Sequence, residues 1–226
     1  MQNKLITLFF ISLFSILNYS IALGEEQFNF NVSEIEILEN GNKFKGKEKG
    51  TITSNDGVVI NADEFEYDKK LNILKARGNV QIVDEINNYE IFSKNVIYEK
   101  NNDFIFTNKN SKAIDIKKGI EIDAEIFEYN ILKNIITAKN NASVENKLFK
   151  YKLSSNFISY LRNENKIFTK GKTFANIYSK YKFSSENVVL LTDLMELISE
   201  NKTTVTDNSN LYKVGKFSYL INEELL

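Results

Sequence analysis

Apolar side chains recur along this chain with a period of about 31 residues, set by a row of mostly aromatic positions. The members of this row, called markers here, are Tyr67, Tyr98, Tyr129, Tyr160 and Leu190, and the steps between them are 31, 31, 31 and 30 residues. Ile37 and Tyr219 continue the row less regularly at its two ends. A fixed period of this length predicts a stack of similar structural units.

Each marker is preceded by a segment that alternates like a β-strand. Apolar residues stand nine and seven positions before the marker, and a small residue stands five positions before it. The first row is Val58, Tyr89, Ile120, Tyr151 and Tyr181, the second is Ile60, Ile91, Ile122, Leu153 and Phe183, and the small residues are Ala62, Ser93, Ala124, Ser155 and Ser185. Because successive side chains of a strand point to opposite faces, the three rows share one face.

The apolar face then shifts by one position, which predicts a bend. The next apolar residues are the markers and the row two positions before them, Phe65, Val96, Phe127, Ile158 and Val188. A face that changes parity indicates a bulge near the small residue, where a strand turns a corner between two layers. Polar residues beside it, such as Asp63 and Lys94, are expected outside the corner.

A polar turn and a second short strand follow each marker. The second strand carries Leu74, Ile105, Ile136, Ile167 or Leu197 seven positions after the marker. Turns are expected to close it at Gly78–Asn79, Lys109–Asn110, Asn140–Asn141, Gly171–Lys172 and Asn201–Lys202. Residues 188–199 could also line a helical face, but the repeat favours strands there.

The predicted fold class is therefore all-β: a repetitive antiparallel β-jelly roll, a V-shaped stacked slide that lengthens along one axis. Each unit is expected to contain two or three short strands. Residues 25–226 are expected to form one domain without a linker.

The two ends of the stack are expected to be exposed edges, where a partner can pair. The residues assigned to these edges are Phe28, Phe30, Val32 and Ile35 at one end and Tyr212, Val214, Phe217 and Tyr219 at the other. The last unit stops at Leu226, inside an expected strand. This predicts that the domain is incomplete at its carboxyl end, either as a fragment of a longer chain or because another chain completes it.

The composition excludes several kinds of site. The 226 residues include 29 Lys and Arg, 30 Asp and Glu, and no His, Cys or Pro. The chain therefore has no histidine base, thiolate nucleophile, disulfide or His/Cys zinc site, and no metal or cofactor is expected. Its net charge of −1 argues against nucleic-acid binding. The acidic pair Asp63–Glu64 and the lysine-rich residues 43–49 are interpreted as solvated surface groups, the lysines in a loop.

The amino terminus predicts a signal peptide over residues 1–24. Lys4 precedes an apolar run from Leu5 to Leu17, and Ala22-Leu23-Gly24 supplies the small residues that a signal peptidase reads. The run is shorter than the roughly 20 residues of a membrane-spanning helix, so a permanent anchor is the less favoured interpretation. We expect the mature chain to be exported.

The repeat resembles that of the OstA-like domain. The segment Ala62-Asp63-x-Phe65-x-Tyr67-Asp68, followed by Ala76-x-Gly78-Asn79-Val80, carries the resemblance, which covers essentially the whole mature chain. This domain occurs in the lipopolysaccharide (LPS) bridge protein LptA and in the amino-terminal periplasmic domain of the LPS-assembly protein LptD. The stop at Leu226 favours a truncated member of the LptD type over a self-contained bridge protein.

The resemblance implies a non-enzymatic module that carries the acyl chains of lipid A in an apolar groove across the periplasm to the outer membrane. Its implied partners are LPS, an LptA-type bridge protein at the N-terminal edge and, within an LptD, an outer-membrane barrel with an LptE-type lipoprotein. Exposing a 12-carbon chain to water costs roughly 9 kcal/mol at about 0.8 kcal/mol per methylene, so a carrier needs a continuous apolar path. The implied lipid-binding residues are Val58, Ile60, Ala62, Tyr89, Ile91, Ser93, Ile120, Ile122, Ala124, Tyr151, Leu153, Tyr181 and Phe183.

Three other interpretations remain open at this point. The chain could be a stand-alone bridge protein of the LptA type. It could be a structural repeat protein whose packed interior binds nothing, in which the markers are only core residues. A polysaccharide-acting enzyme on a β-solenoid is a third, although its acidic residues would gather in one unit and here they recur across units.

Overall fold

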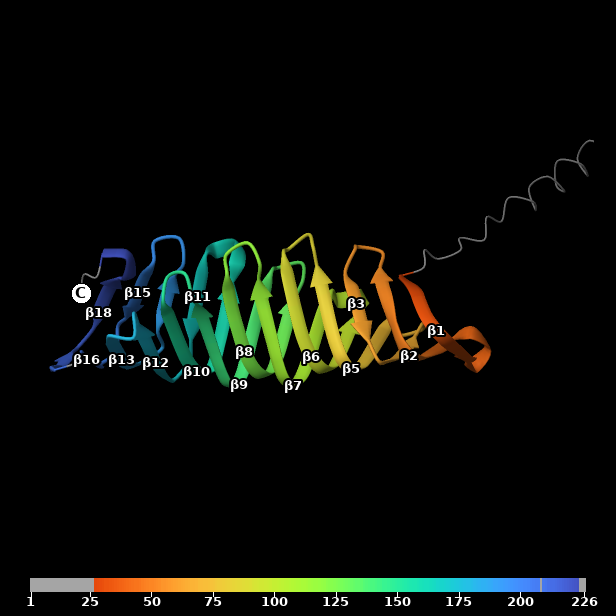
Figure 1. The fold of residues 1–226 in the computed structure, drawn as a ribbon, viewed down its shortest axis with the longest axis horizontal. Helices are drawn as coiled ribbons and strands as arrows, with labels where there is room; N and C mark the ends of the chain where they lie inside the picture. The colour runs from red at the N-terminus through yellow and green to blue at the C-terminus, as the bar shows by residue number, and fades with distance from the viewer. Residues whose placement is uncertain (1–26, 208, 224–226) are drawn as a thin grey trace, which may run out of the picture.

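The computed structural model describes residues 27–207 and 209–223, and these fold almost entirely into β-strands that lie side by side along one long axis (Figure 1). The predicted all-β class is confirmed. The strands are β1 (Phe28–Leu38), β2 (Lys43–Ser54), β3 (Val59–Ala62), β4 (Glu64–Asp68), β5 (Ile73–Asp84), β6 (Tyr89–Glu99), β7 (Phe104–Asp115), β8 (Ile120–Asn130), β9 (Ile135–Asn146), β10 (Tyr151–Leu161), β11 (Lys166–Thr169), β12 (Lys172–Ile177), β13 (Tyr181–Glu186), β14 (Val189–Leu191), β15 (Glu196–Ser199), β16 (Thr203–Thr206), β17 (Leu211–Val214) and β18 (Phe217–Leu220).

Short 3-10 turns make up the helical structure of the described residues. They are η1 (Glu39–Gly41), η2 (Lys100–Asn102), η3 (Arg162–Glu164) and η4 (Ile221–Glu223). Within residues 27–207 and 209–223, no helix has the length and hydropathy needed to span a membrane. The predicted signal peptide and Leu226 lie outside the described residues.

All strand pairs are antiparallel, and each long strand bends in its middle. One half of the strand therefore belongs to one layer and the other half to a second layer, called here the first and second walls. The first wall contains the later half of β5 with the earlier half of β6, as in the pair Ile82↔Ile91, and the second wall contains the other two halves, as in Leu74↔Tyr98. Each repeat adds two strands to each wall and lengthens the stack by about 10 Å.

The bend is a bulge, as the parity change predicts. The pairing register shifts between Arg77 and Val80 on β5, and at the equivalent places on β6, β7, β8 and β10. The expected closing turns at Gly78–Asn79, Lys109–Asn110 and Asn140–Asn141 are wrong, because these pairs lie inside β5, β7 and β9. Two consecutive residues with positive φ, such as Gly78 (72°) and Asn79 (45°), bend the strand without reversing it. The central repeats consequently contain two long bent strands, whereas β3 with β4 and the strands from β11 onward are divided at the bend into shorter ones.

The small residues five positions before the markers lie at this bend. Ser93 Oγ is 3.1 Å from the carbonyl oxygens of Asn95 and Asn108 and from Ser111 Oγ. Ser185 Oγ donates to Ser199 Oγ at 2.9 Å and accepts from Thr203 Oγ1 at 2.7 Å. Buried hydroxyls thus satisfy polar groups that the bulge removes from the regular ladder.

Two further expectations are resolved by the strand assignment. Residues 189–191 and 196–199 form β14 and β15, so the strand interpretation of this segment is confirmed. The lysine-rich residues 43–49 are part of β2, so the loop interpretation is wrong. β2 pairs with β1 on one side and with β3 and β4 on the other, so these lysines belong to a strand inside the sheet.

Gly78 provides a test of the bend. A Cβ added at this residue would collide with Oδ2 of Asp63, and its φ of +72° disfavours any side chain. We expect Gly78→Ala to lower the free energy of unfolding by about 1–3 kcal/mol in urea denaturation. The matched control is Gly215→Ala, where an added Cβ meets no atom within 4 Å and φ is not positive. Equal effects of the two substitutions would contradict this account.

Candidate functional site

The predicted lipid-binding residues lie together on the inner face of the first wall. Twelve of the thirteen are buried, and the exception, Tyr181, is half-buried. The exposed fractions of Ile60, Ile91, Ile122, Leu153 and Phe183 are 0%, 1%, 2%, 0% and 2%. These side chains form a continuous apolar stripe from β3 to β13.

The second wall faces this stripe with its own apolar side chains, and the two walls together make one core. The buried residues of the second wall include the markers and Phe65, Leu74, Ala76, Val96, Ile105, Phe127, Ile136, Ala138, Ile158, Ile167 and Leu197. Sequence reasoning placed these residues in the core but did not assign them to the site. Their alternation is the same as that of the first wall, so the pattern alone does not separate lining residues from packing residues.

Residues of the first wall on the intervening strands were missed. Val80, Ile82, Ala113, Ala142, Val144 and Ala175 are also buried between the walls. They directly pair with predicted residues, for example Ile82 with Ile91 and Val144 with Leu153. The sequence period could have identified them, because Ile82, Ala113, Val144 and Ala175 recur every 31 residues, just as the tyrosine markers do.

Polar side chains join the free ends of the two walls, on the side opposite the bends. This side is called the mouth. Tyr129 Oη donates to Asp84 Oδ2 at 2.7 Å, although the two residues are 45 positions apart. Tyr160 Oη donates to Asp115 Oδ2 at 2.8 Å, across the same number of positions. Each contact connects a marker on the second wall with an aspartate at the end of a first-wall strand.

A third contact of the same kind lies nearer the amino end. Lys100 Nζ donates to Asp56 Oδ2 at 2.9 Å, and Tyr98 Oη lies 3.3 Å from the same oxygen. We call these three sets of contacts the clasp; its residues are Asp56, Tyr98 and Lys100, then Asp84 and Tyr129, then Asp115, Tyr160 and Arg162. Arg162 Nε donates to Asp115 Oδ2 at 2.6 Å. The clasp closes the mouth at three successive positions in the described structure.

The aspartates of the clasp also hold the turns that carry them. Asp84 Oδ1 accepts the backbone N–H of Asn87 at 2.9 Å, and Asp115 Oδ1 accepts that of Lys118 at 3.0 Å. One carboxylate oxygen therefore fixes the turn while the other reaches the opposite wall. A carboxylate suits both tasks because each of its oxygens accepts hydrogen bonds.

Burial and neighbouring charges shift the pKa values of several clasp side chains. Burial, reinforced by Asp84, raises the pKa of Tyr129, and burial together with Asp115 raises that of Tyr160. Burial alone would lower the pKa of Lys100, but its hydrogen bonds to Asp103 and Asp56 outweigh this and leave the pKa raised. At neutral pH the phenols of Tyr129 and Tyr160 are therefore neutral, and Lys100 is protonated.

One buried polar atom in the stripe is unsatisfied. The hydroxyl of Tyr89 has no hydrogen-bond partner, although its ring packs edge-on against that of Tyr129 at 5.2 Å between centroids. A buried hydroxyl without a partner costs about 1–3 kcal/mol. The closed interior therefore contains an energetically unfavourable group, the Tyr89 hydroxyl, among the predicted lipid-binding residues.

The predicted edge residues divide between the ends and the core. β1 pairs with β2 on one side, and β17 and β18 pair with β16 and β15 at the other end of the stack. Ile35 and Tyr212 are 43% and 45% exposed, but Phe28, Phe217 and Tyr219 are buried. The strands are thus at the two ends as expected, while three of the named side chains point into the core.

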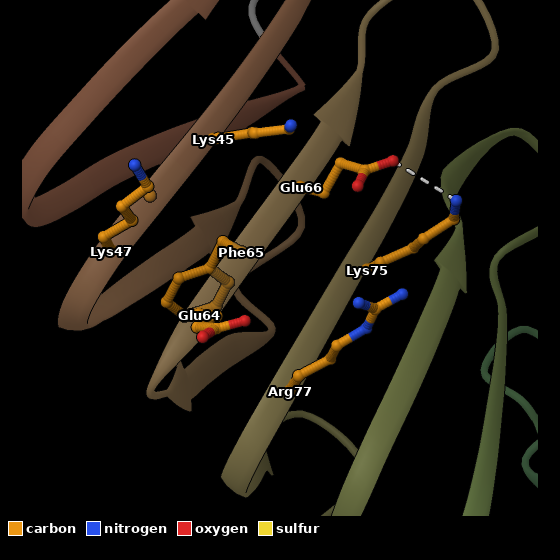
Figure 2. Close-up of a pocket in the computed structure, with 8 residues that line it drawn as sticks. Lys45, Lys47, Glu64, Phe65, Glu66, Lys75 and Arg77 are labelled. Atoms are coloured by element: carbon orange, nitrogen blue, oxygen red, sulfur yellow. Dashed lines mark hydrogen bonds and ion pairs between the residues drawn. The ribbon is translucent and has the colours of Figure 1, made fainter.

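A shallow pocket on the outer face near the amino end is lined mostly by charged side chains (Figure 2). Lys45, Lys47, Lys75 and Arg77 surround Glu64 and Glu66, and Lys75 Nζ lies 3.3 Å from Glu66 Oε1. Exposed pairs of this kind contribute about 0–1 kcal/mol. The described residues include no group of three or more acidic side chains placed to hold a metal ion.

The clasp can be tested by removing one acceptor. Asp84→Asn replaces an acceptor with an amide that cannot accept from Tyr129 and Asn87 together, so we expect the free energy of unfolding to fall by about 1–3 kcal/mol. Urea denaturation measures this change. Asp123→Asn, on the exposed face of β8, is the control and should change it by less than about 0.5 kcal/mol. Similar losses in both variants would contradict a role for the clasp.

The buried tyrosines predict an instability at high pH. The folded-state pKa values of Tyr98, Tyr129 and Tyr160 are raised above about 10, the value in an unfolded chain. Their contribution to stability is complete below pH 10 and is lost as the pH rises further, because only the unfolded chain then releases these protons. We expect the free energy of unfolding to decrease above pH 10, with phenolate absorbance appearing only as the chain unfolds. Ionisation of all tyrosines near pH 10 in a folded chain would contradict this.

No protein-family model matches the chain, and no curated protein matches it. The solved structures include a similar one, the crystal structure of LptH from Pseudomonas aeruginosa, described as the LptA homologous periplasmic component of the conserved lipopolysaccharide transport device. It matches with a TM-score of 0.45 and 11% sequence identity, over 50% of this chain and 82% of that chain. A likeness at this level does not assign a function to this chain.

Proposed function

We propose that this chain is a non-enzymatic module of LPS transport that holds lipid A acyl chains between its two walls. The observation that carries the proposal is the uninterrupted apolar stripe from β3 to β13, which presents nearly the same surface in each repeat. A lipid can move along such a stripe in small steps because each position binds it about equally. The resemblance of the repeat to the OstA-like domain supports the same function.

The closed interior requires that the walls separate when a lipid enters. Opening one clasp position breaks between one and three hydrogen bonds to an aspartate, each worth about 1.5–3 kcal/mol. Burying an acyl chain returns about 0.8 kcal/mol per methylene, so a chain of ordinary length more than offsets that loss. Because the clasp consists of separate contacts, one position can open while the others stay closed.

We further propose a location and partners for the module. The predicted signal peptide and the resemblance support export to the periplasm, with an LptA-type bridge protein pairing at the β1 edge. If residues 25–226 are the periplasmic domain of an LptD, an outer-membrane barrel and an LptE-type lipoprotein follow. A stand-alone bridge protein of the LptA type is the alternative, and the accessible backbone of β1 and β17 suits either arrangement.

A structural scaffold with no ligand is the second candidate function. The near-zero exposure of Ile60, Ile91 and Leu153 favours it, because the closed interior is already filled by the side chains of the two walls. The two functions differ in one property that can be measured: whether the inner face of the first wall meets a lipid.

Site-specific photo-crosslinking in cells that are transporting LPS tests the proposal. A photoreactive leucine analogue at Ile91 or Ile122 is close in size to isoleucine, so the core should remain packed. We expect LPS adducts at both residues, and none at Glu90 and Glu121, which are their outward-facing neighbours on β6 and β8. The absence of adducts at Ile91 and Ile122 during active transport would favour the scaffold.

A further inference from the structure

The mouth continues past the three clasp positions to a fourth one, formed by the next repeat. At this fourth position every clasp residue is replaced by a residue of another type. The row that contains Asp84 and Asp115 continues with Asn146, and the marker row continues from Tyr129 and Tyr160 to Leu190. Leu190 has no polar atom in its side chain and therefore cannot join the walls. The repeat thus keeps its apolar core here but loses the contact that closes it.

Asn146 keeps one of the two tasks of the clasp aspartates. Its Oδ1 accepts the backbone N–H groups of Leu148 and Phe149 at 3.0 and 3.1 Å, as the aspartates do in their turns. Its amide nitrogen, Nδ2, donates to the carbonyl oxygen of Lys118 at 2.9 Å within the first wall. An amide nitrogen cannot accept a hydrogen bond from the second wall.

Two more replacements remove a charged group and an amide from the second wall at this position. Thr192 occupies the place of Lys100 and Arg162, and its buried Oγ1 has no hydrogen-bond partner. Met195 occupies the place of Asn134 and Asn165. It is 3% exposed and has a φ of 53°, a conformation that is uncommon for a bulky side chain and indicates a local constraint.

A cavity of about 300 Å³ lies at this position. Its apolar lining includes Ile120, Tyr151 and Met195, and its polar lining includes Lys118, Asn146 and Thr192. Ile120 and Tyr151 are two of the predicted lipid-binding residues, so the cavity reaches the apolar stripe from outside. Leu148 and Leu194 are 79% and 59% exposed on its two sides. Its size is at the lower end of ligand-binding pockets, which suits one chain and not a bundle of chains.

The charge of the rim favours an anion. Lys118 Nζ donates to Asn165 Oδ1 at 2.5 Å and lies 3.5 Å from the carbonyl oxygen of Arg162, and both acceptors are neutral. Lys117 adds a second cation at the same turn, and Asp193 is the acidic residue of the lining. Burial lowers the pKa of Lys118, although Asp115 and Asp193 act in the opposite direction, and a further anion beside its ammonium group would stabilise the protonated form.

From these replacements we infer that the fourth position is a lateral portal, which admits a single acyl chain of an anionic amphiphile between the walls. The chain lies on Ile120, Tyr151 and Met195, and the phosphate or carboxylate of the headgroup lies at Lys117 and Lys118. This inference deepens the proposed function and depends on it for the destination of the chain. The three clasped positions remain closed while the portal is occupied.

The experiment uses the mature chain and dodecyl phosphate with a diazirine at the end of its alkyl chain, below its micelle concentration. Mass spectrometry of the labelled protein locates the adduct, which we expect at Ile120, Tyr151 or Met195. Butyl phosphate and dodecyl maltoside compete in separate arms. We expect both to compete at least about tenfold less well than dodecyl phosphate, since one lacks the chain and the other the charge.

Rebuilding the clasp should close the portal. The double variant Asn146→Asp and Thr192→Arg recreates the pair formed by Asp115 and Arg162, and we expect it to reduce labelling by about tenfold or more. A second variant, Thr192→Trp, fills the cavity without adding a charge and should have the same effect. The matched control is Asn29→Asp with Thr53→Arg, which places the same charges on directly paired residues of β1 and β2. Circular dichroism confirms that each variant is folded.

The outcomes separate the portal from the proposed function. Labelling elsewhere, or labelling that neither Thr192 variant reduces, would overturn the portal. Absence of portal labelling in the unaltered chain, with LPS adducts at Ile91 and Ile122 retained, would also overturn the portal while leaving the transport function intact. Absence of those adducts in the unaltered chain, with portal labelling retained, would reject transport but keep a binding site for anionic amphiphiles.

Discussion

The hydrogen bonds between the free ends of the two walls decide whether the apolar interior is a core or a groove. The bends hold the walls together on one side through the backbone, which is continuous there. On the other side the walls are joined through side chains, by the contacts of the clasp and by further hydrogen bonds such as those of Asn134 to Asn87 and of Tyr178 to the carbonyl oxygen of Ile221. Since these contacts are few and polar while the interior is long and apolar, the mouth is the place where the molecule can open at the lowest cost.

The same repeat can serve either stability or access, depending on a small number of side chains. A carboxylate at the end of a first-wall strand fixes its own turn and reaches the second wall. An amide at the equivalent place, Asn146, fixes the turn only. The stack can therefore be closed at some positions and left open at another by a change of side chains at the rim, while strand pairing continues past all of them.

The bends explain a feature of the composition. Asparagine is the most frequent of the non-glycine residues with positive φ, and these residues lie at the bulges and in the turns at the mouth. Asparagine tolerates the left-handed conformation better than most residues do, and its amide bonds neighbouring backbone groups. Proline would remove the N–H groups that a continuous antiparallel ladder needs, which fits its absence from the chain.

The sequence by itself determined the repeat, the all-β class, the inner face of each wall and the bend beside the small residues, because side-chain alternation and its change of parity are local properties. It misassigned Gly78–Asn79 and its counterparts as closing turns, since consecutive left-handed residues can either reverse a strand or bend it. Only the tertiary structure decided that Asp84 meets Tyr129 across the mouth, that Phe28 and Tyr219 point inward, and that a cavity opens beside Asn146. These facts depend on which free ends face each other once the walls fold together, and residues 45 positions apart carry no local signal of that pairing.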